Sequence, residues 1–278
     1  MHAAPPHAST VPPVPRFNVL GVAISALTLE RARDLILDAC RAPHAILPAS
    51  RPPARYICLA GVHGLGEAHD DPALRHVFNA AWLATPDGMP LVWIGKLLQR
   101  EPLTRVYGPD LMLAVCDAGR IQNLRHYFFG GPPGLAEELR DRLVTRFPGL
   151  TVVGTFTPPF RPLDPAETAA LRADIARTQP HLVWVGLSTP KQERFMAEFA
   201  AQLDTRVLIG VGAAFDFLAG TKPQAPRLLQ RTGLEWLYRL ATEPRRLAPR
   251  YLRHVPLFLG RVFLQLTRLR RYPAYSES

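Results

Sequence analysis

Long apolar runs are absent from this sequence of 278 residues, although 47% of its residues are hydrophobic. No stretch reaches about 18 uninterrupted apolar residues, so no segment is expected to cross a bilayer as a helix. Prolines interrupt residues 1–16, where a signal peptide would need an apolar segment, and residues 1–15 are expected to form a disordered leader. These absences predict a cytoplasmic protein, or one bound to the cytosolic face of a membrane.

Cysteine is scarce as well, and several common catalytic and metal-binding motifs are missing. The three cysteines are Cys40, Cys58 and Cys116. They are widely spaced and odd in number, which indicates reduced thiols rather than a disulfide framework or a zinc site. The sequence contains no Asp-x-Asp pair, no His/Cys cluster, no HExxH and no Gly-x-Ser-x-Gly. We therefore expect no bound metal and no serine hydrolase nucleophile elbow.

The positive charge of the chain is concentrated near its C-terminus. The whole chain has a formal net charge of +10. Residues 222–278 hold 12 Lys and Arg but only 3 Asp and Glu, whereas the remainder holds 21 basic and 20 acidic residues. This division predicts a nearly neutral core at 16–221 that carries the chemistry, and a basic helical appendage at 222–278 that holds anions.

Apolar segments with strand character alternate with amphipathic helical segments along the core. Strands are predicted at 56–62, 82–85, 125–131, 150–156, 181–188 and 206–212. Helices are predicted at 28–41, 64–81, 91–99, within 106–123, and at 133–148, 164–179 and 189–203, with a strand or hairpin at 16–25. Because strands that are apolar on both faces pack between helices, this alternation indicates an α/β fold with a mostly parallel sheet and helices on both faces.

Ligands of such sheets bind beyond the carboxyl ends of the strands. Loops rich in Gly, Pro and small polar residues follow six apolar segments, at 61–64, 85–88, 130–134, 156–159, 188–193 and 213–220. They predict a site for a large polar ligand. Asp87 has two interpretations, because Asp-Gly is a common turn pair and because a carboxylate at a strand end can accept a proton from a hydroxyl nucleophile.

Two of these loops precede helices and also have two interpretations each. Gly130 and Gly131 can offer backbone N–H groups to a diphosphate, or they can form a tight strand-to-helix connection. In the second loop, Thr189 can cap the next helix and Gln192 stands three residues later, as in a capping box. Lys191 and Gln192 would also face a ligand at that helix N-terminus, so structural and binding roles both stay open.

The segment at 210–215 is similar to a dinucleotide fingerprint but has Phe215 in place of the third glycine. The segment also comes late in the predicted sheet, so NAD binding is not expected. Asp216 can bind a sugar or ribose hydroxyl, or it can cap a loop. His63 follows a strand and has small neighbours, but a lone histidine is more often a structural group than a ligand.

The C-terminal segment is amphipathic. Its apolar residues recur at three- and four-residue steps and are Leu252, Val255, Phe258, Leu259, Val262, Phe263, Leu266 and Leu269. Arg253, Arg261 and Arg268 make the rest of the segment basic. This pattern favours a helix on anionic lipid, with these arginines and with Phe258 and Phe263 as membrane-binding residues. A helix docked on the core is the alternative, and nucleic acid is a competing partner that would need more aromatic stacking platforms.

Six ordered segments resemble one family of enzymes. They are TPDGMP (85–90), RVYGPDLM (105–112), FFGGPPG (128–134), VGLSTPKQE (185–193), GVGAAFDFLAG (210–220) and APRLLQRTGLEWLYRLATEPRRL (225–247). The last string is long and unusual enough to be specific. Over about residues 16–253 the chain resembles the WecG/TagA/CpsF glycosyltransferases, and it looks most like their exopolysaccharide-type branch.

The resemblance implies a bacterial, inverting, metal-independent glycosyltransferase with a Rossmann-like core. It implies transfer from a UDP-sugar, of the N-acetylmannosamine, uronic acid or hexose type, to a polyprenyl-diphosphate-linked acceptor at the inner leaflet. The product would be an exopolysaccharide or another cell-surface glycan. No cofactor is implied, because the UDP-sugar is a co-substrate. The appendage would touch anionic lipid and bring arginines over the active site. The chain could also form a homo-oligomer.

The resemblance implies roles for five residues, by their positions in the family's motifs. Asp87 would be the general base on the acceptor hydroxyl. Arg105 and Gln192 would contact substrate or donor phosphate. Arg239 and Arg246 would offset charge on the departing nucleotide diphosphate, a task that suits the planar and always charged guanidinium.

The chain departs from the family pattern after the strand at 56–62. Many members have Thr and Asn where this chain has Leu59 and Gly61, followed by His63. His63 is therefore a rival for the role of base. Two non-enzymatic interpretations remain, a nucleic-acid-binding module, suggested by the isoelectric point of about 10.1, and a non-catalytic lipid-binding scaffold.

Overall fold

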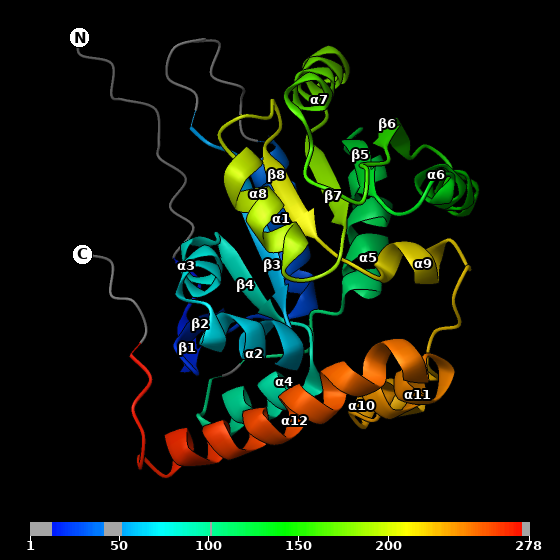
Figure 1. Ribbon diagram of the computed structural model, residues 1–278. Helices are drawn as coiled ribbons and strands as arrows, with labels where there is room; N and C mark the ends of the chain where they lie inside the picture. The colour runs from blue at the N-terminus through cyan, green and yellow to red at the C-terminus, as the bar shows by residue number, and fades with distance from the viewer. Residues whose placement is uncertain (1–12, 42–51, 101, 274–278) are drawn as a thin grey trace, which may run out of the picture.

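A sheet of six parallel strands forms the centre of the molecule (Figure 1). The computed structural model describes residues 13–41, 52–100 and 102–273. The strands are β3 (Arg55–Ala60), β4 (Leu83–Pro86), β5 (Arg125–Gly130), β6 (Thr151–Phe156), β7 (Leu182–Gly186) and β8 (Val207–Gly210). Their order in the sheet is β4-β3-β8-β7-β5-β6, and every neighbouring pair is parallel. The predicted α/β fold with a parallel sheet is confirmed.

Helices cover both faces of this sheet, as the alternation along the chain predicts. One face carries α2 (Val62–Asp70), α3 (Pro72–Ala80), α7 (Pro165–Thr178) and α8 (Lys191–Phe199). The other face carries α1 (Leu29–Arg41), α5 (Gly108–Arg120), α6 (Leu135–Arg146) and α9 (Ala214–Leu218). α4 (Met89–Leu97) follows β4, and the predicted hairpin is formed by β1 (Arg16–Val19) and β2 (Val22–Ser25).

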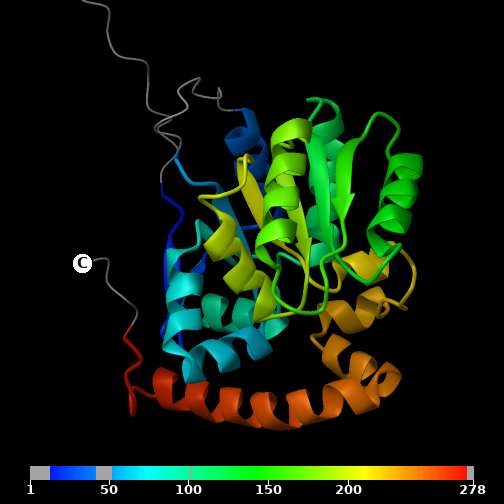
Figure 2. The same cartoon turned by 45° about the horizontal axis from the view of Figure 1, so that its top comes forward.

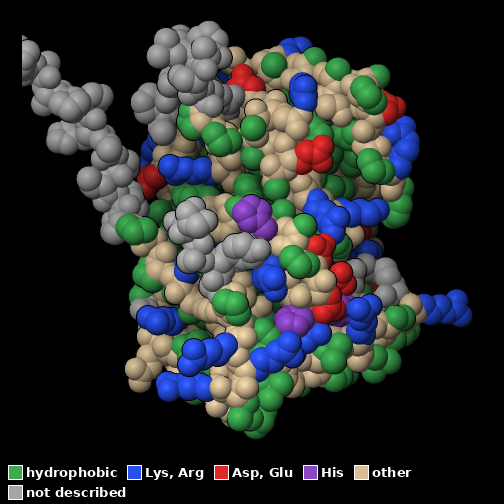
Figure 3. All heavy atoms as spheres, turned by 60° about the vertical axis from the view of Figure 1, so that its left-hand side comes forward, with side chains coloured by type: hydrophobic (Ala, Val, Ile, Leu, Met, Phe, Trp, Pro, Cys, Tyr) green, Lys and Arg blue, Asp and Glu red, His purple; other side chains and the backbone are tan. Residues whose placement is uncertain are grey.

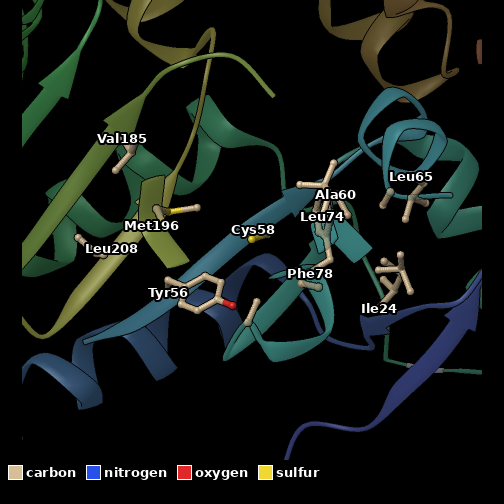
Figure 4. Close-up of a cluster of buried hydrophobic side chains, with 14 of the residues drawn as sticks. Ile24, Tyr56, Cys58, Ala60, Leu65, Leu74, Phe78, Val185, Met196 and Leu208 are labelled. Carbon is tan, nitrogen blue, oxygen red and sulfur yellow. The ribbon is translucent and has the colours of Figure 1, made fainter. Parts of the chain in front are cut away.

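Alternate side chains of β3 enter two separate hydrophobic cores. Tyr56, Cys58 and Ala60 join the core that also holds residues of α2, α3 and α8 (Figure 4). Ile57 and Leu59 join the core that holds residues of α1 and α5. Because both faces of the strand are covered, its sequence is a continuous apolar run instead of an alternation of apolar and polar residues.

The helix predicted at 64–81 is divided into α2 and α3 at Asp71. The Asp71 carboxylate accepts two backbone N–H groups of α3, at 2.9 and 3.1 Å, and so acts as its N-cap. Pro72 stands at the first helical position, where the missing N–H has no intrahelical partner to lose. The Asp-Pro pair therefore starts a new helix inside a segment whose periodicity alone predicts one.

The C-terminal helices lie across the carboxyl ends of the strands. They are α10 (Arg227–Arg231), α11 (Glu235–Thr242) and α12 (Pro244–Leu266). α12 runs along one side of the molecule in both ribbon views and packs against α2 and α11 (Figures 1 and 2). None of the helices in the described ranges combines the length and the apolar character that crossing a bilayer requires.

Candidate active site

A cleft of about 300 Å³ opens at the carboxyl end of the sheet. The segments that follow β3, β4, β7 and β8 line it, together with residues of α11 and α12. These four strands are neighbours in the sheet. The described loops after β5 and β6 stay outside the lining, because those strands form the far edge of the sheet. The predicted ligand site at the strand ends thus involves four of the six loops.

Asp87 contributes a carboxylate whose ionised form is disfavoured by its surroundings. Its backbone N–H donates to the carbonyl oxygen of Ala60 at 2.9 Å, which ties the loop after β4 to β3. Its Oδ1 accepts the N–H of Gly108 at 3.4 Å. Burial raises the pKa of this carboxyl to about 6, although the positive charges of Arg105 and Arg239 oppose the shift. Such a carboxylate is ionised at neutral pH and is a better proton acceptor than an ordinary aspartate.

Arg105 is fixed by partners on the cleft wall. Its guanidinium donates to Oε2 of Glu235 at 2.7 Å and to the backbone carbonyl of Asp87. It also lies 4.0 Å from the centre of the Tyr107 ring. The Tyr107 hydroxyl donates to the other oxygen of Glu235 at 3.1 Å. Glu235 is 8% exposed, so this ion pair joins α11 to the sheet away from bulk water.

Arg239 lies one turn after Glu235 on α11 and is the more available cation. It lines the cleft, and its guanidinium lies 5.4 Å from the centre of the Phe217 ring. Its Nε is buried and has no hydrogen-bond partner among the described residues. A buried donor without a partner costs about 1–3 kcal/mol, so an anionic ligand that accepts this hydrogen bond would be stabilised.

Gln192 lines the cleft from the first turn of α8 and is 4% exposed. Its Nε2 donates to Oε1 of Glu193 at 2.9 Å, and the Thr189 hydroxyl donates to the same oxygen at 3.0 Å. Burial raises the pKa of Glu193. Oε1 of Gln192 has no partner in the described part of the chain. In this amide orientation Oε1 of Gln192 can accept a hydrogen bond from a hydroxyl or N–H group of a ligand. It cannot bind a phosphate oxygen, which also only accepts hydrogen bonds.

The capping box predicted at Thr189 is wrong. α8 begins at Lys191 and has no side-chain hydrogen bond at its N-cap. Thr189 bonds to the Glu193 side chain instead, and Gln192 is committed to Glu193 and to the cleft, so it cannot reach back to the N-cap. A complete capping box stands at the start of α7, where Asp164 exchanges hydrogen bonds with a glutamate three residues later.

His63 lines the same cleft from the first turn of α2. Its Nδ1 lies 3.8 Å from Oε1 of Glu67, and its ring stands edge-on to the ring of His254 with 4.8 Å between the ring centres. His254 belongs to α12 and is 5% exposed. The histidine that the sequence presents as isolated is therefore part of a group of three titratable side chains.

Comparisons with known proteins identify the family of the chain. Residues 17–272 match the family described as Glycosyl transferase WecG/TagA/CpsF family. The chain belongs to this family. It is also similar to the N-acetylglucosaminyldiphosphoundecaprenol N-acetyl-beta-D-mannosaminyltransferase of Bacillus spizizenii, with 31% identity over 180 residues that cover 65% of this chain and 68% of the relative. The resemblance seen in the motifs is confirmed, and the chain is a glycosyltransferase.

Gly130 and Gly131 of this glycosyltransferase lie outside the cleft lining. Both have positive φ, at 134° and 78°. A Cβ at position 130 would lie 2.6 Å from the carbonyl oxygen of Gly186, and the N–H of Gly131 donates to the same oxygen at 3.2 Å. Glycine is needed because β5 and β7 approach so closely. The strand contact explains the two glycines, and their role in binding a diphosphate stays a prediction.

Two further predicted ligand residues, Lys191 and Asp216, are not part of the cleft lining. Lys191 is exposed, and its ammonium lies over the Phe160 ring at 4.5 Å. Asp216 lies on α9 and pairs with Lys222 at 3.3 Å. Both side chains make contacts within the protein, and their roles in substrate binding stay predictions. The side chain of Arg246 lies outside the described residues.

The two phenylalanines predicted to bind membrane lie on different faces of α12. Phe258 is 2% exposed and belongs to the hydrophobic core, so its expected contact with lipid is wrong. The helix uses Phe258 and Val262, one turn apart, to dock on the rest of the protein. Phe263 is 62% exposed and stays available to a membrane. The docked-helix alternative and the lipid-facing alternative thus describe two faces of the same helix.

The arginines of the same prediction are partly engaged with the core. Arg253 and Arg261 both contact the carboxylate of Asp70 on α2, at 3.5 and 3.0 Å. Arg268 is exposed beyond the end of α12. One carboxylate cannot balance two guanidinium groups, so the surface keeps positive charge. Figure 3 shows Lys and Arg side chains gathered over the lower part of the face that it presents, at the level of α12.

Sequence reasoning missed Glu235, Glu193 and His254. Glu235 is acidic within a basic appendage, and this contrast could have suggested an internal ion pair. Glu193 has no such signal, because an exposed acidic residue is also common in the first turn of a helix. His254 was missed because its partners on α2 are distant in the sequence, and only the packing of α12 brings them together.

Proposed function

We propose that this glycosyltransferase moves a sugar from a UDP-sugar to a polyprenyl-diphosphate-linked saccharide, with inversion at the anomeric carbon and without a metal or another cofactor in the reaction. The observation that carries the proposal is the meeting of the Asp87 carboxylate with Arg105 and Arg239 in one cleft. A base and cations in one cleft meet the two needs of the reaction, which are removal of a hydroxyl proton and stabilisation of a diphosphate.

The relative from Bacillus spizizenii supports a choice of substrates. Its name states that it transfers an N-acetylmannosaminyl group to N-acetylglucosaminyldiphosphoundecaprenol. We therefore favour an N-acetylmannosamine donor over the uronic acid and hexose donors, and an acceptor whose first sugar is attached to a polyprenyl diphosphate. Production of an exopolysaccharide or of another bacterial surface glycan stays part of the proposal.

The proposed reaction is a single displacement. The acceptor hydroxyl oxygen forms a bond to the anomeric carbon while its proton passes to the Asp87 carboxylate. The bond from the anomeric carbon to the diphosphate oxygen breaks, and the electron pair leaves with the nucleotide diphosphate. Attack from the side opposite the leaving group inverts the anomeric centre. The raised pKa of Asp87, about 6, favours uptake of the proton and still leaves the base ionised at pH 7.

The other cleft residues divide the remaining tasks. Arg239 has a buried Nε without a described partner and would stabilise the departing diphosphate. Arg105 is held by Glu235 and would support the same charge from a fixed position. Oε1 of Gln192 would accept a hydrogen bond from a hydroxyl of the sugar or from an N–H of the uracil ring. We do not give His63 the role of general base, because its contacts hold it between α2 and α12; it would lie beside the acceptor.

Release of UDP tests this proposal directly. Purified full-length protein would be mixed with UDP-N-acetylmannosamine and a short-chain prenyl diphosphate that carries N-acetylglucosamine, and other UDP-sugars would serve as matched donors. We expect UDP release that requires both substrates and that continues in the presence of EDTA. If no donor in the panel released UDP with any lipid-linked acceptor, the proposal would be wrong.

We also propose that the appendage binds the cytosolic face of the membrane. Exposed apolar side chains support this location beside the cleft. They are Trp93 and Leu97 on α4, Trp236 and Leu237 on α11, and Leu252, Leu259 and Phe263 on α12. Trp236 and Leu259 also line the cleft, so a lipid-linked acceptor could reach it from this surface. Apolar side chains next to basic ones favour anionic lipid over nucleic acid.

Flotation with liposomes tests the membrane proposal. Replacing Leu252, Leu259 and Phe263 by serine should lower binding to anionic vesicles, because the apolar area of the surface is lost while the buried face of α12 is kept. Replacement of the exposed Ile121 on the opposite part of the core by serine is the matched control. Equal flotation of the two variants would contradict a role of α12 in membrane binding.

A further inference from the structure

Three side chains with metal-binding atoms meet where α2 and α12 pack together. They are His63 and Glu67 of α2 and His254 of α12, and their ligand atoms all lie within 4.8 Å of one another. Oε1 of Glu67 lies 3.8 Å from Nδ1 of His63 and 3.2 Å from Nε2 of His254. His63 and Glu67 are four residues apart, so one face of α2 presents both.

These distances are close to those of a zinc site. Bonds of about 2.0–2.2 Å from zinc to nitrogen or oxygen, in tetrahedral geometry, place neighbouring ligand atoms roughly 3.3 Å apart. The contact between Glu67 and His254 already has this length, and the contact between Glu67 and His63 exceeds it by a fraction of an ångström. The two histidine nitrogens lie within 4.8 Å of each other, so the imidazoles would have to turn to bring them together by up to about 1.5 Å around one ion.

Gly66 makes room for the histidine from α12. A Cβ at position 66 would lie 2.4 Å from Nδ1 of His254, which is closer than any real contact allows. The imidazole therefore rests directly on the backbone of α2, and its Nε2 points to the carboxylate of Glu67. His254 is 5% exposed, so its orientation is fixed by packing. A buried imidazole seated on a glycine and aimed at a carboxylate is a preorganised ligand pair.

We infer that His63, Glu67 and His254 form a binding site for one divalent transition-metal ion, with zinc as the preferred ion. Two imidazoles and one carboxylate match the ligands that zinc uses, whereas magnesium and calcium prefer sites made only of oxygen. Three protein ligands leave the fourth position for water. The expectation of no metal relied on spacing in the sequence, which cannot reveal a ligand set shared by distant helices.

The ion would join α12 to α2 and so hold the appendage over the cleft. α12 is connected to the core by ion pairs with Asp70 and by the buried Phe258 and Val262. Its other residues at the cleft include Tyr251 and Leu259. A metal bond between the helices would lower the frequency with which α12 separates from α2. This inference depends on the geometry of the three side chains and not on the proposed sugar transfer.

Calorimetric titration with zinc chloride tests the site in full-length protein that has been freed of metal with a chelator. We expect saturable binding of one zinc per chain, and no comparable binding of magnesium. Glu67→Gln and His254→Gln should each weaken zinc binding by at least about tenfold, since even changes in groups that only support a ligand cost that much. His76→Gln, a change of an exposed histidine on α3, is the matched control and should leave the affinity unchanged.

Hydrogen exchange locates the ion. Zinc should slow amide exchange in α12 and α2 of the wild-type protein and of His76→Gln, but not in Glu67→Gln, which keeps the size of the side chain and the fold. The inference is overturned if the wild-type protein shows no saturable zinc binding. It is also overturned if Glu67→Gln and His254→Gln bind zinc as tightly as His76→Gln, because the ion would then bind elsewhere.

Discussion

The loops after β4 and β5 look alike in the sequence, but they differ in position and in chemistry. Both follow buried strands, and both are rich in Gly and Pro. The loop after β4 lines the cleft, whereas the loop after β5 lies toward the far edge of the sheet. The order β4-β3-β8-β7-β5-β6 makes this difference, because it separates β4 from β5 although they are consecutive strands.

Both regions contain buried polar atoms without a described partner, but those beside β4 belong to residues that line the cleft. Beside β4, Asp87 carries a carboxylate with a raised pKa, and Arg239 and Gln192 each have a buried atom without a described partner. Beside β5, the N–H of Gly131 is bonded to Gly186, while Oε2 of Glu137 has no described partner and lies outside the cleft lining. Local polar groups that lack partners are costly, and proteins keep them mostly at functional sites. The comparison therefore points to the loop after β4 as the reactive one.

The largest expected effect in this comparison comes from Asp87→Asn. Removal of a general base costs about 10²–10⁴-fold in rate, so kcat should fall by that factor while the fold and nucleotide binding are retained. Release of UDP measures the rate, and equilibrium binding of UDP measures the affinity. His63→Asn is the matched variant in the same cleft and should lower kcat much less. A reversed ranking of the two variants would give the role of base to His63.

A smaller effect is expected from Arg239→Gln. One group that stabilises developing charge contributes about 10²–10³-fold in kcat, and Arg239 has a buried donor available for that purpose. Lys191→Gln is the matched change of a cation outside the cleft lining, and its kcat should stay within a few-fold of the wild type. Both variants would be measured by UDP release at saturating substrates. Equal losses in both would mean that the diphosphate also reaches α8.

Much of the fold could be predicted from the sequence, because strand and helix patterns are local. Continuous apolar runs identified β3 and its neighbours, and the motif positions identified Asp87, Arg105, Gln192 and Arg239 as site candidates, all of which line the cleft. The order of the strands is not local, so the sequence could not show that the loop of Gly131 lies outside the cleft lining. The partners of His63 could not be predicted either, since α12 brings His254 to it from a distant part of the chain.

The far edge should respond to substitution in stability instead of catalysis. In Gly130→Ala the new Cβ would lie 2.6 Å from the carbonyl of Gly186, at a φ of 134°. Backbone strain and overpacking each cost about 1–3 kcal/mol, so the free energy of unfolding should fall by a few kcal/mol. Denaturant titration measures this loss. The kcat per folded molecule should be unchanged. A loss of kcat without a loss of stability would mean that the loop after β5 takes part in the reaction.

The smallest expected effect is a gain in stability from Asp87→Asn. The pKa of this carboxyl rises from 3.8 to about 6 on folding, chiefly because of burial. Below pH 3.8 the carboxyl is neutral in the folded and the unfolded state, so its burial does not lower the free energy of unfolding. Between pH 3.8 and about 6 the unfolded state has lost its proton while the folded state still holds it, so stability falls across this range by at most about 3 kcal/mol.

Asparagine lacks this ionisation, so the variant should be more stable than the wild type at pH 7.5 by about 1–3 kcal/mol, and the two should converge near pH 4. Thermal unfolding at both pH values measures the difference. Asp141→Asn on α6, beside the far edge, is the matched control, since that carboxylate is 67% exposed and its substitution should change stability by less than about 0.5 kcal/mol. A gain at pH 7.5 with a loss of turnover in the same variant would show that this glycosyltransferase keeps a destabilising carboxylate for its chemistry, whereas equal stability would mean that water reaches Asp87 freely.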